Sequence, residues 1–89
     1  MDGQASISPE ILARYAGDAA RDVPGVHDLA GRRPVKVDGT HVEVHLVVDW
    51  GASIQEVGTA VRDRVREYLR RMARVESASV DVVVDDVAS

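Results

Sequence analysis

The stretch VEVHLVVDWGASIQEVGTAVRDRVREYL, residues 42–69, decides the fold because its hydrophobic period changes halfway along. Across residues 42–50 every second residue is apolar, which is typical of a strand with one buried face. Ser53 and Glu56 then have the spacing of a helix capping box, and the apolar residues that follow recur at three- and four-residue intervals. We therefore predict a strand followed by an amphipathic helix that runs to about residue 73.

The same periodicities predict which residues of this stretch are buried. The apolar residues of the helix, including Ile54 near its start and Met72 near its end, fall within about 120° of one another, so we place them on one core face. The alternation of the strand extends to Trp50 and places that side chain on the apolar face of the sheet.

The preceding residues predict another helix and a hairpin. Ser8-Pro9-Glu10 combine an N-cap, a first-turn proline and an acid at the positive end of the helix dipole, so a helix begins there and ends by Pro24-Gly25. Residues 26–29 fit a short extended segment, which we leave out of the element order. Residues 35–38 alternate again, and Asp38-Gly39 predicts the tight turn of a β-hairpin.

A closing strand completes the fold, because the valines of residues 80–84 alternate with other residues and the segment ends in acids. A helix of ~20 residues spans ~30 Å, about the length of the strand before it, so this last strand should run parallel to residues 42–50. We predict a single α+β domain over residues 1–89, with two amphipathic helices on one face of a small mixed sheet of three to four strands. A further short strand near residues 5–7 would precede the first helix.

The composition narrows the range of functions. The chain has 89 residues, enough for one domain, and its two tyrosines and one tryptophan are the only aromatics, so the core must be aliphatic. The absence of cysteine removes disulfides, thiolate metal sites and cysteine nucleophiles. No apolar run approaches the ~18 residues that span a bilayer. We expect a cytoplasmic protein that uses no cofactor.

The ionisable residues form no recognisable catalytic or metal motif. His41, Glu43 and His45 should project from one strand face, but the two histidines would lie ~13 Å apart, too far to meet on one zinc ion without help. The serines show no arrangement with a base, and Lys36 follows no glycine-rich phosphate loop. We predict neither an enzyme nor a metal protein.

Arginines make the second predicted helix the most unusual surface, with six arginines against three acids in residues 53–74 of a chain whose net charge is −4. In one interpretation they pair with acids three or four positions away, complement the helix C-terminus and cover apolar edges. In the other they bind an acidic protein, the aspartates of another copy, phospholipid headgroups or nucleic acid. The candidate interaction surface comprises Arg62, Arg66, Arg70, Arg71, Arg74, Asp81, Asp85 and Asp86.

Nucleic acid is the least favoured of these partners. No two glycines are spaced as in a Gly-x-x-Gly loop, and the strands carry no row of aromatic residues on which bases could stack. A nucleic-acid or anionic-membrane binding module that uses the arginine-rich helix remains the alternative function.

Three segments together, ISPEILARYAGDAARDVPGV at residues 7–26, residues 42–69, and VDVVVDD at residues 80–86, resemble the alkaline shock protein family, small envelope stress response proteins of Gram-positive bacteria. Trp50 stands where that family usually has a tyrosine. The resemblance implies a cytoplasmic, non-enzymatic protein that gathers at the inner face of the membrane through a membrane-anchored partner and can self-associate. It implies no catalytic residues. The leading hypothesis is an interaction or scaffolding protein of cell-envelope stress homeostasis.

Overall fold

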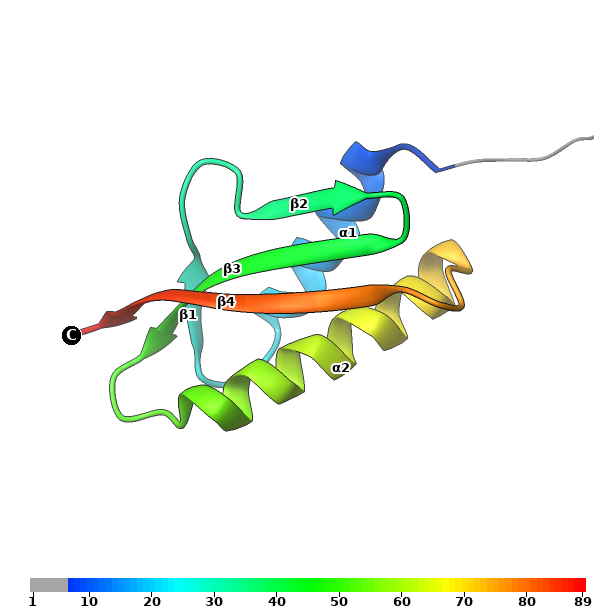
Figure 1. Cartoon of the computed structure of the whole chain (residues 1–89). Helices are drawn as coiled ribbons and strands as arrows, with labels where there is room; N and C mark the ends of the chain where they lie inside the picture. The colour runs from blue at the N-terminus through cyan, green and yellow to red at the C-terminus, as the bar shows by residue number, and fades with distance from the viewer. Residues whose placement is uncertain (1–6) are drawn as a thin grey trace, which may run out of the picture.

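The structure, a computed structural model, describes residues 7–89 and has the element order α1, β1, β2, β3, α2, β4 (Figure 1). It confirms the predicted α+β fold with two helices and a mixed sheet, to which β1 adds a strand. The strand considered near residues 5–7 lies outside the described residues except for Ile7, which belongs to no strand. The elements are α1 (Pro9–Arg21), β1 (Val26–Leu29), β2 (Val35–Asp38), β3 (His41–Asp49), α2 (Ile54–Ala73) and β4 (Ser79–Ala88).

Strand β3 is the centre of the sheet. On one side, β2 and β1 pair antiparallel with the first and second halves of β3. On the other side, β4 pairs in parallel along all of β3, from His41 opposite Ser79 to Asp49 opposite Ala88. This confirms the predicted direction of the last strand, because α2 carries the chain back along the sheet before β4 begins (Figure 1).

Both helices begin where the capping signals predict. The hydroxyl of Ser8 accepts a hydrogen bond from the backbone N–H of Ile11 at 3.3 Å, and the hydroxyl of Ser53 accepts one from Glu56 at 3.2 Å. Helix α2 ends at Ala73, as predicted, and Arg74 adopts the left-handed conformation with φ +57° that often terminates helices.

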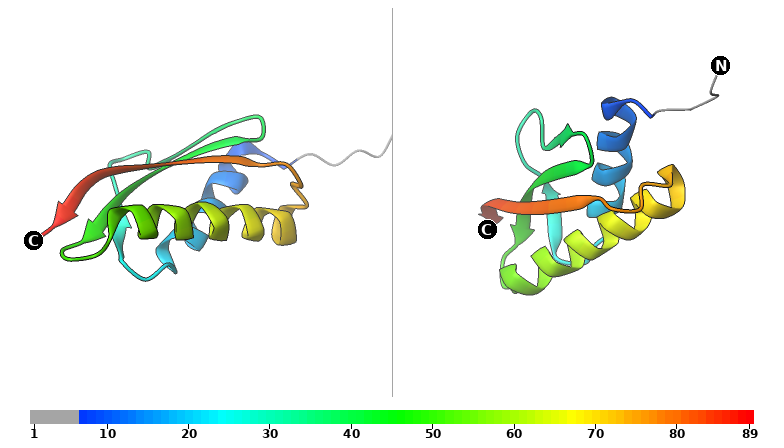
Figure 2. Two further views of the ribbon diagram at one scale, coloured as in Figure 1. Left: turned by 60° about the horizontal axis from the view of Figure 1, so that its bottom comes forward. Right: turned by 45° about the vertical axis from the view of Figure 1, so that its right-hand side comes forward.

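The two helices cover one face of the sheet and leave the other open (Figure 2). Every second residue of β3 points into the core between the layers, and each is at most 1% exposed. The alanines of α1 allow close packing, and Tyr15 of α1 meets Tyr68 of α2 edge to face with ring centroids 5.9 Å apart. The most deeply buried large side chains are Val42, Val44, Leu46, Val48, Val61, Val65 and Leu69.

Three of the predicted core residues are exposed instead. Trp50 is 80% exposed, because β3 ends at Asp49 and the chain turns through Gly51 at φ +85°, which ends the alternation one residue early. Ile54 and Met72 are about half exposed because only the central turns of α2 pack on the core. The helical pattern identified the correct face but not where its contact with the sheet stops.

Candidate interaction surfaces

The open face of the sheet carries most of the acids that the strands contribute. The residues of β3 that alternate with the core, His41, Glu43 and His45, point to this face. Their partners in β2 and β4 point the same way, and a register shift near Leu46 places two successive aspartates of β4 on it. We call this the acidic sheet face, and it comprises Asp38, Glu43, Asp81, Asp85 and Asp86.

His45 lies at the centre of this face between two carboxylates. Its Nε2 is 2.5 Å from Glu43 Oε2, and its Nδ1 is 3.1 Å from Asp85 Oδ1. Hydrogen bonding to Glu43, and then to Asp85, raises the pKa of His45, while the bond to His45 lowers the pKa of Glu43. When it is protonated, the imidazolium can donate to both carboxylates at once.

The other histidine predicted on this face has its own carboxylate partner. His41 Nε2 lies 3.2 Å from Asp81 Oδ2, and His41 Nδ1 lies 3.3 Å from the hydroxyl of Ser79. His41, Glu43 and His45 therefore share a face as expected, but the two histidines bind different acids of β4 and do not converge. Among residues 7–89, no three His, Cys, Asp or Glu side chains are grouped so as to hold a metal ion.

The arginine surface consists of Arg62, Arg66, Arg70, Arg71 and Arg74, on α2 and at its C-cap. Arg70 is engaged within the helix, because it pairs with Glu67 at 2.6 Å and that hydrogen bond raises the pKa of Arg70. Arg62 lies 3.8 Å from Asp63. In the part of the chain that the structure describes, Arg66, Arg71 and Arg74 have no carboxylate at ion-pair distance. Pairing within the helix therefore accounts for Arg62 and Arg70 but not for Arg66, Arg71 and Arg74.

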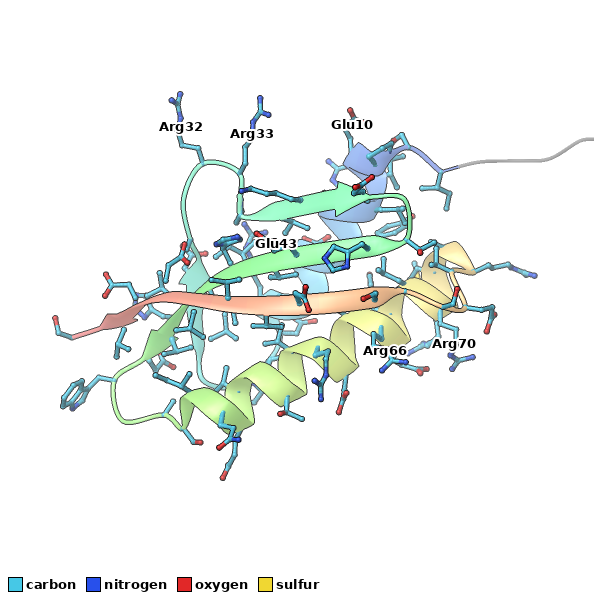
Figure 3. The ribbon with its side chains drawn as sticks, viewed as in Figure 1. Glu10, Arg32, Arg33, Glu43, Arg66 and Arg70 are labelled. Carbon is cyan, nitrogen blue, oxygen red and sulfur yellow. The ribbon has the colours of Figure 1, made fainter. Side chains whose placement is uncertain are left out.

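The predicted arginines lie on the helical layer, whereas the predicted aspartates lie on the open face of the sheet. The structure brings Asp81, Asp85 and Asp86 together on the open face. The arginine surface belongs to α2 and its C-cap, and α2 lies in the helical layer on the other side of the sheet (Figure 2). Figure 3 shows Arg66 and Arg70 projecting from α2 away from the strands. Arg62 comes nearest to these acids, because it lines the same groove as Asp81. Within residues 7–89, none of the five arginines lies at ion-pair distance from Asp81, Asp85 or Asp86.

A groove of about 420 Å³ runs between α2 and the edge strand β4. We call it the α2–β4 groove. The helix lines it at Gly58 and the strand lines it with three valines, and Arg62 and Asp81 are its two charged lining residues. The lining residues are Ile54, Gln55, Gly58, Thr59, Arg62, Val80, Asp81, Val82 and Val84.

A second group of cations borders the open face. Arg32 and Arg33, in the loop between β1 and β2, line an open depression of about 810 Å³ together with Lys36, His45 and Asp85. Within residues 7–89 these three cations have no carboxylate at ion-pair distance. Figure 3 shows Arg32 and Arg33 pointing away from the sheet. The sequence marks this loop as basic, but it gives no sign that the loop lies beside His45.

Trp50 is an exposed aromatic residue that the sequence pattern concealed. An exposed tryptophan offers a large apolar surface with one hydrogen-bond donor, a combination that is enriched in protein interfaces. It follows Asp49, which pairs with Ala88, so Trp50 lies at the end of the sheet where β4 also ends. The available signal was its position next to Gly51 and the helix cap at Ser53, which mark the end of the strand.

The fold and these surfaces define a small α+β domain with opposed charged faces. None of the helices within residues 7–89 combines the length and the apolar character needed to cross a bilayer. The sequence profile of the alkaline shock protein 23 family, described as having a cell envelope-related function, matches residues 34–89. This chain belongs to that family.

Individual proteins and solved structures are similar to this chain over most of its length. The chain is 28% identical to YqhY of Bacillus subtilis, an uncharacterised protein, over 90% of this chain and 73% of the relative. Among solved structures, a zinc form of a MamM CTD variant matches with a TM-score of 0.59 and 24% identity over 86% of this chain and 84% of the other. Another MamM CTD variant matches with a TM-score of 0.60 and 23% identity over 86% and 94% of the two chains. At this identity the solved structures show a shared fold alone.

Proposed function

We propose that this chain is a non-enzymatic interaction protein of cell-envelope stress homeostasis that assembles through its two charged faces. The observation that carries the proposal is the placement of the arginine surface and the acidic sheet face on opposite sides of one small domain. In such an arrangement the arginine surface of one copy contacts the acidic sheet face of the next, or the corresponding acidic surface of a membrane-anchored partner. The cell envelope-related description of the family supports this setting.

The geometry favours contacts between unlike surfaces. Two arginine surfaces would repel each other, and so would two acidic sheet faces, whereas one of each attract. Arg66 and Arg71 are the best placed to contribute, because in the described part of the chain no carboxylate lies at ion-pair distance from either. Exposed ion pairs are screened over ~8 to 10 Å at physiological ionic strength, so assembly should weaken as salt is raised.

Sedimentation velocity at low and high salt tests this proposal. We expect the wild type to associate at low salt and to dissociate at high salt, and we expect Arg66→Glu combined with Arg71→Glu to remain monomeric at both. The control variant combines Arg14→Glu with Arg32→Glu. It changes the net charge as much as the Arg66 and Arg71 double variant does, but at positions outside α2, and it should still associate. A wild type that is monomeric at both salt concentrations, in the absence and presence of a membrane extract from its host, would contradict the proposal.

Binding to an anionic surface is the second candidate function. It is favoured by Arg32, Arg33 and Lys36, which have no acidic partner within residues 7–89, in addition to the arginine surface. The anionic surface could be a membrane or a nucleic acid. Co-sedimentation with phosphatidylglycerol vesicles tests the membrane, and a gel shift with single-stranded RNA at low salt tests the nucleic acid. The absence of binding in both experiments would remove it.

A further inference from the structure

Strand β4 presents a long free edge. It contains 10 residues, from Ser79 to Ala88, and within the described chain it pairs only with β3. The backbone N–H and C=O groups on its outer edge are therefore available to another strand. Strands of this length are usually shielded at the edge of a sheet, or they pair with another chain.

Apolar side chains accompany this edge. Val80, Val82 and Val84 line the α2–β4 groove at alternate positions of the strand, and the latter two are only partly covered. On the helix side, Ile54 is 49% exposed, and a Cβ added at Gly58 would meet nothing within 4 Å. The edge thus offers backbone hydrogen bonds beside open space lined by apolar groups. These are the two elements by which a sheet binds an added strand.

The opposite side of β4 determines the charge of such a strand. Asp81, Asp85 and Asp86 point to the open face. Asp81 and Asp85 would stand beside alternate residues of an incoming segment, and the register shift brings Asp86 to the same face. Opposite charges on neighbouring strands stabilise a sheet, and like charges destabilise it. A segment that fits both sides therefore has apolar residues toward the groove and lysine or arginine toward the aspartates.

A second copy of this chain fits the edge poorly. Two β4 strands paired antiparallel about Val83 would place Asp81 of each copy opposite Asp85 of the other. More generally, joining the two edges brings the three aspartates of each copy onto one face of a continuous sheet. The charge pattern therefore selects a different, basic segment.

We propose that the β4 edge binds an extended segment of a partner protein, in which apolar and basic residues alternate, as an added strand of the sheet. This inference rests on the proposed function, because it assumes that the chain acts by binding proteins, and it adds the local chemistry of the partner. It uses the edge and the groove, and Arg62 is the one residue of the arginine surface that also lines the groove.

A fluorescently labelled peptide of alternating valine and lysine, as long as the 10-residue strand β4, is the probe. We expect its fluorescence anisotropy to rise on titration with the protein. Two peptides control for charge and sequence pattern. One alternates valine with glutamate, and the other has the same composition as the probe but places all the lysines before all the valines. Both should bind at least ~10-fold more weakly, which corresponds to about 1.4 kcal/mol.

Gly58→Leu fills the groove and should lower the affinity for the alternating peptide at least ~10-fold. The variant should fold, because the space beside Gly58 is open and leucine favours helix more than glycine does. Ala60→Leu adds a similar side chain on the exposed side of α2, outside the groove, and should bind as the wild type does. Equal affinity of the wild type and Gly58→Leu, or equal binding of the alternating and segregated peptides, would overturn the proposal.

A further pair of measurements separates this inference from the proposed function. Arg66→Glu combined with Arg71→Glu should retain peptide binding even though it loses salt-dependent assembly. If assembly is absent while the alternating peptide binds and Gly58→Leu abolishes that binding, the edge site stands and the charged-face proposal falls. The wild type could instead dimerise while the Gly58→Leu variant stays monomeric and neither protein binds a peptide. In that case a second copy occupies the edge and the inference is wrong.

Discussion

The two faces of β3 are made of alternating residues of one nine-residue strand, yet they differ in burial and in polarity. On the covered face, Val42, Val44, Leu46 and Val48 are at most 1% exposed and belong to one apolar core with residues of both helices. On the open face, His41 and His45 bind carboxylates of the neighbouring strand. The comparison shows that the covered face supplies the free energy of folding. The residues of the open face can therefore be ionisable. Substitutions on the two faces should therefore have different consequences.

The largest effect is expected for a truncation on the covered face. Leu46→Ala removes a side chain that is fully buried, and we expect it to lower the free energy of unfolding by about 3 kcal/mol, since the residual cavity adds to the lost transfer energy. Val47→Ala, one residue along and on the open face, should cost less than ~1 kcal/mol. Urea denaturation of both variants measures the difference. Equal losses would show that the open face is as important to stability as the core.

A pair of glycines extends the comparison to the loops. Gly25, at φ +95°, packs against α2, and a Cβ added there would lie 2.6 Å from Cγ2 of Val57. Gly51 has a similar φ of +85° but nothing within 4 Å of an added Cβ. We expect Gly25→Ala to cost about 2 kcal/mol or more, from overpacking added to backbone strain, and Gly51→Ala about 1 kcal/mol from strain alone. Thermal unfolding of the two variants tests this order.

Local patterns in the sequence were sufficient to predict the covered face. Ser8 and Ser53 begin their helices by hydrogen bonds to residues three positions away, and the core valines of β3 follow from alternation. These features depend on near neighbours in the chain. Strand β1 was predicted only as a short extended segment outside the element order, because it is defined by pairing with β3, some 20 residues away, and by the bond from Asp49 N–H to the carbonyl of Gly25.

The open face and the candidate site depended on tertiary contacts that local patterns do not encode. The sequence places Glu43 and His45 on one side of a strand, but the partner Asp85 comes 40 residues later, and a register shift decides which aspartates of β4 face it. Likewise, the arginines of α2 were recognisable as a group, yet the separation of Arg66 and Arg71 from Asp81 required the layer order. Exposure of Trp50 depended on where β3 ends.

A smaller effect is expected from the ionisable cluster on the open face, and it should depend on pH. The pKa of His45 is raised above 6.5, so the stability it contributes is complete below that value and is lost as pH rises through the raised pKa. The pKa of Glu43 is lowered from 4.5, so its contribution is complete above 4.5 and is lost as pH falls through the lowered pKa. The cluster therefore stabilises the fold fully between these two ordinary values.

Replacing Glu43 by glutamine tests this expectation without removing the side chain. Glu43→Gln should lower the pKa of His45, because the first of its two carboxylate partners is lost while Asp85 remains. Titration of the His45 ring protons by NMR measures the pKa, and thermal unfolding from pH 5 to pH 9 should show a weaker dependence than in the wild type. The same His45 pKa in both proteins would mean that the Glu43 contact does not persist in solution.

The smallest effect on stability is expected at Trp50, although its side chain is the largest in the molecule. Because it is 80% exposed, Trp50→Ala should change the free energy of unfolding by no more than ~0.5 kcal/mol, a value typical of surface positions. Acrylamide should quench its fluorescence almost as efficiently as that of free tryptophan. A loss of ~2 kcal/mol, or strong protection from quenching in the monomer, would show that Trp50 packs on the domain. If stability is unchanged but assembly or binding to the β4 edge is weakened, Trp50 serves an interface, because its apolar area is buried only when a partner is present.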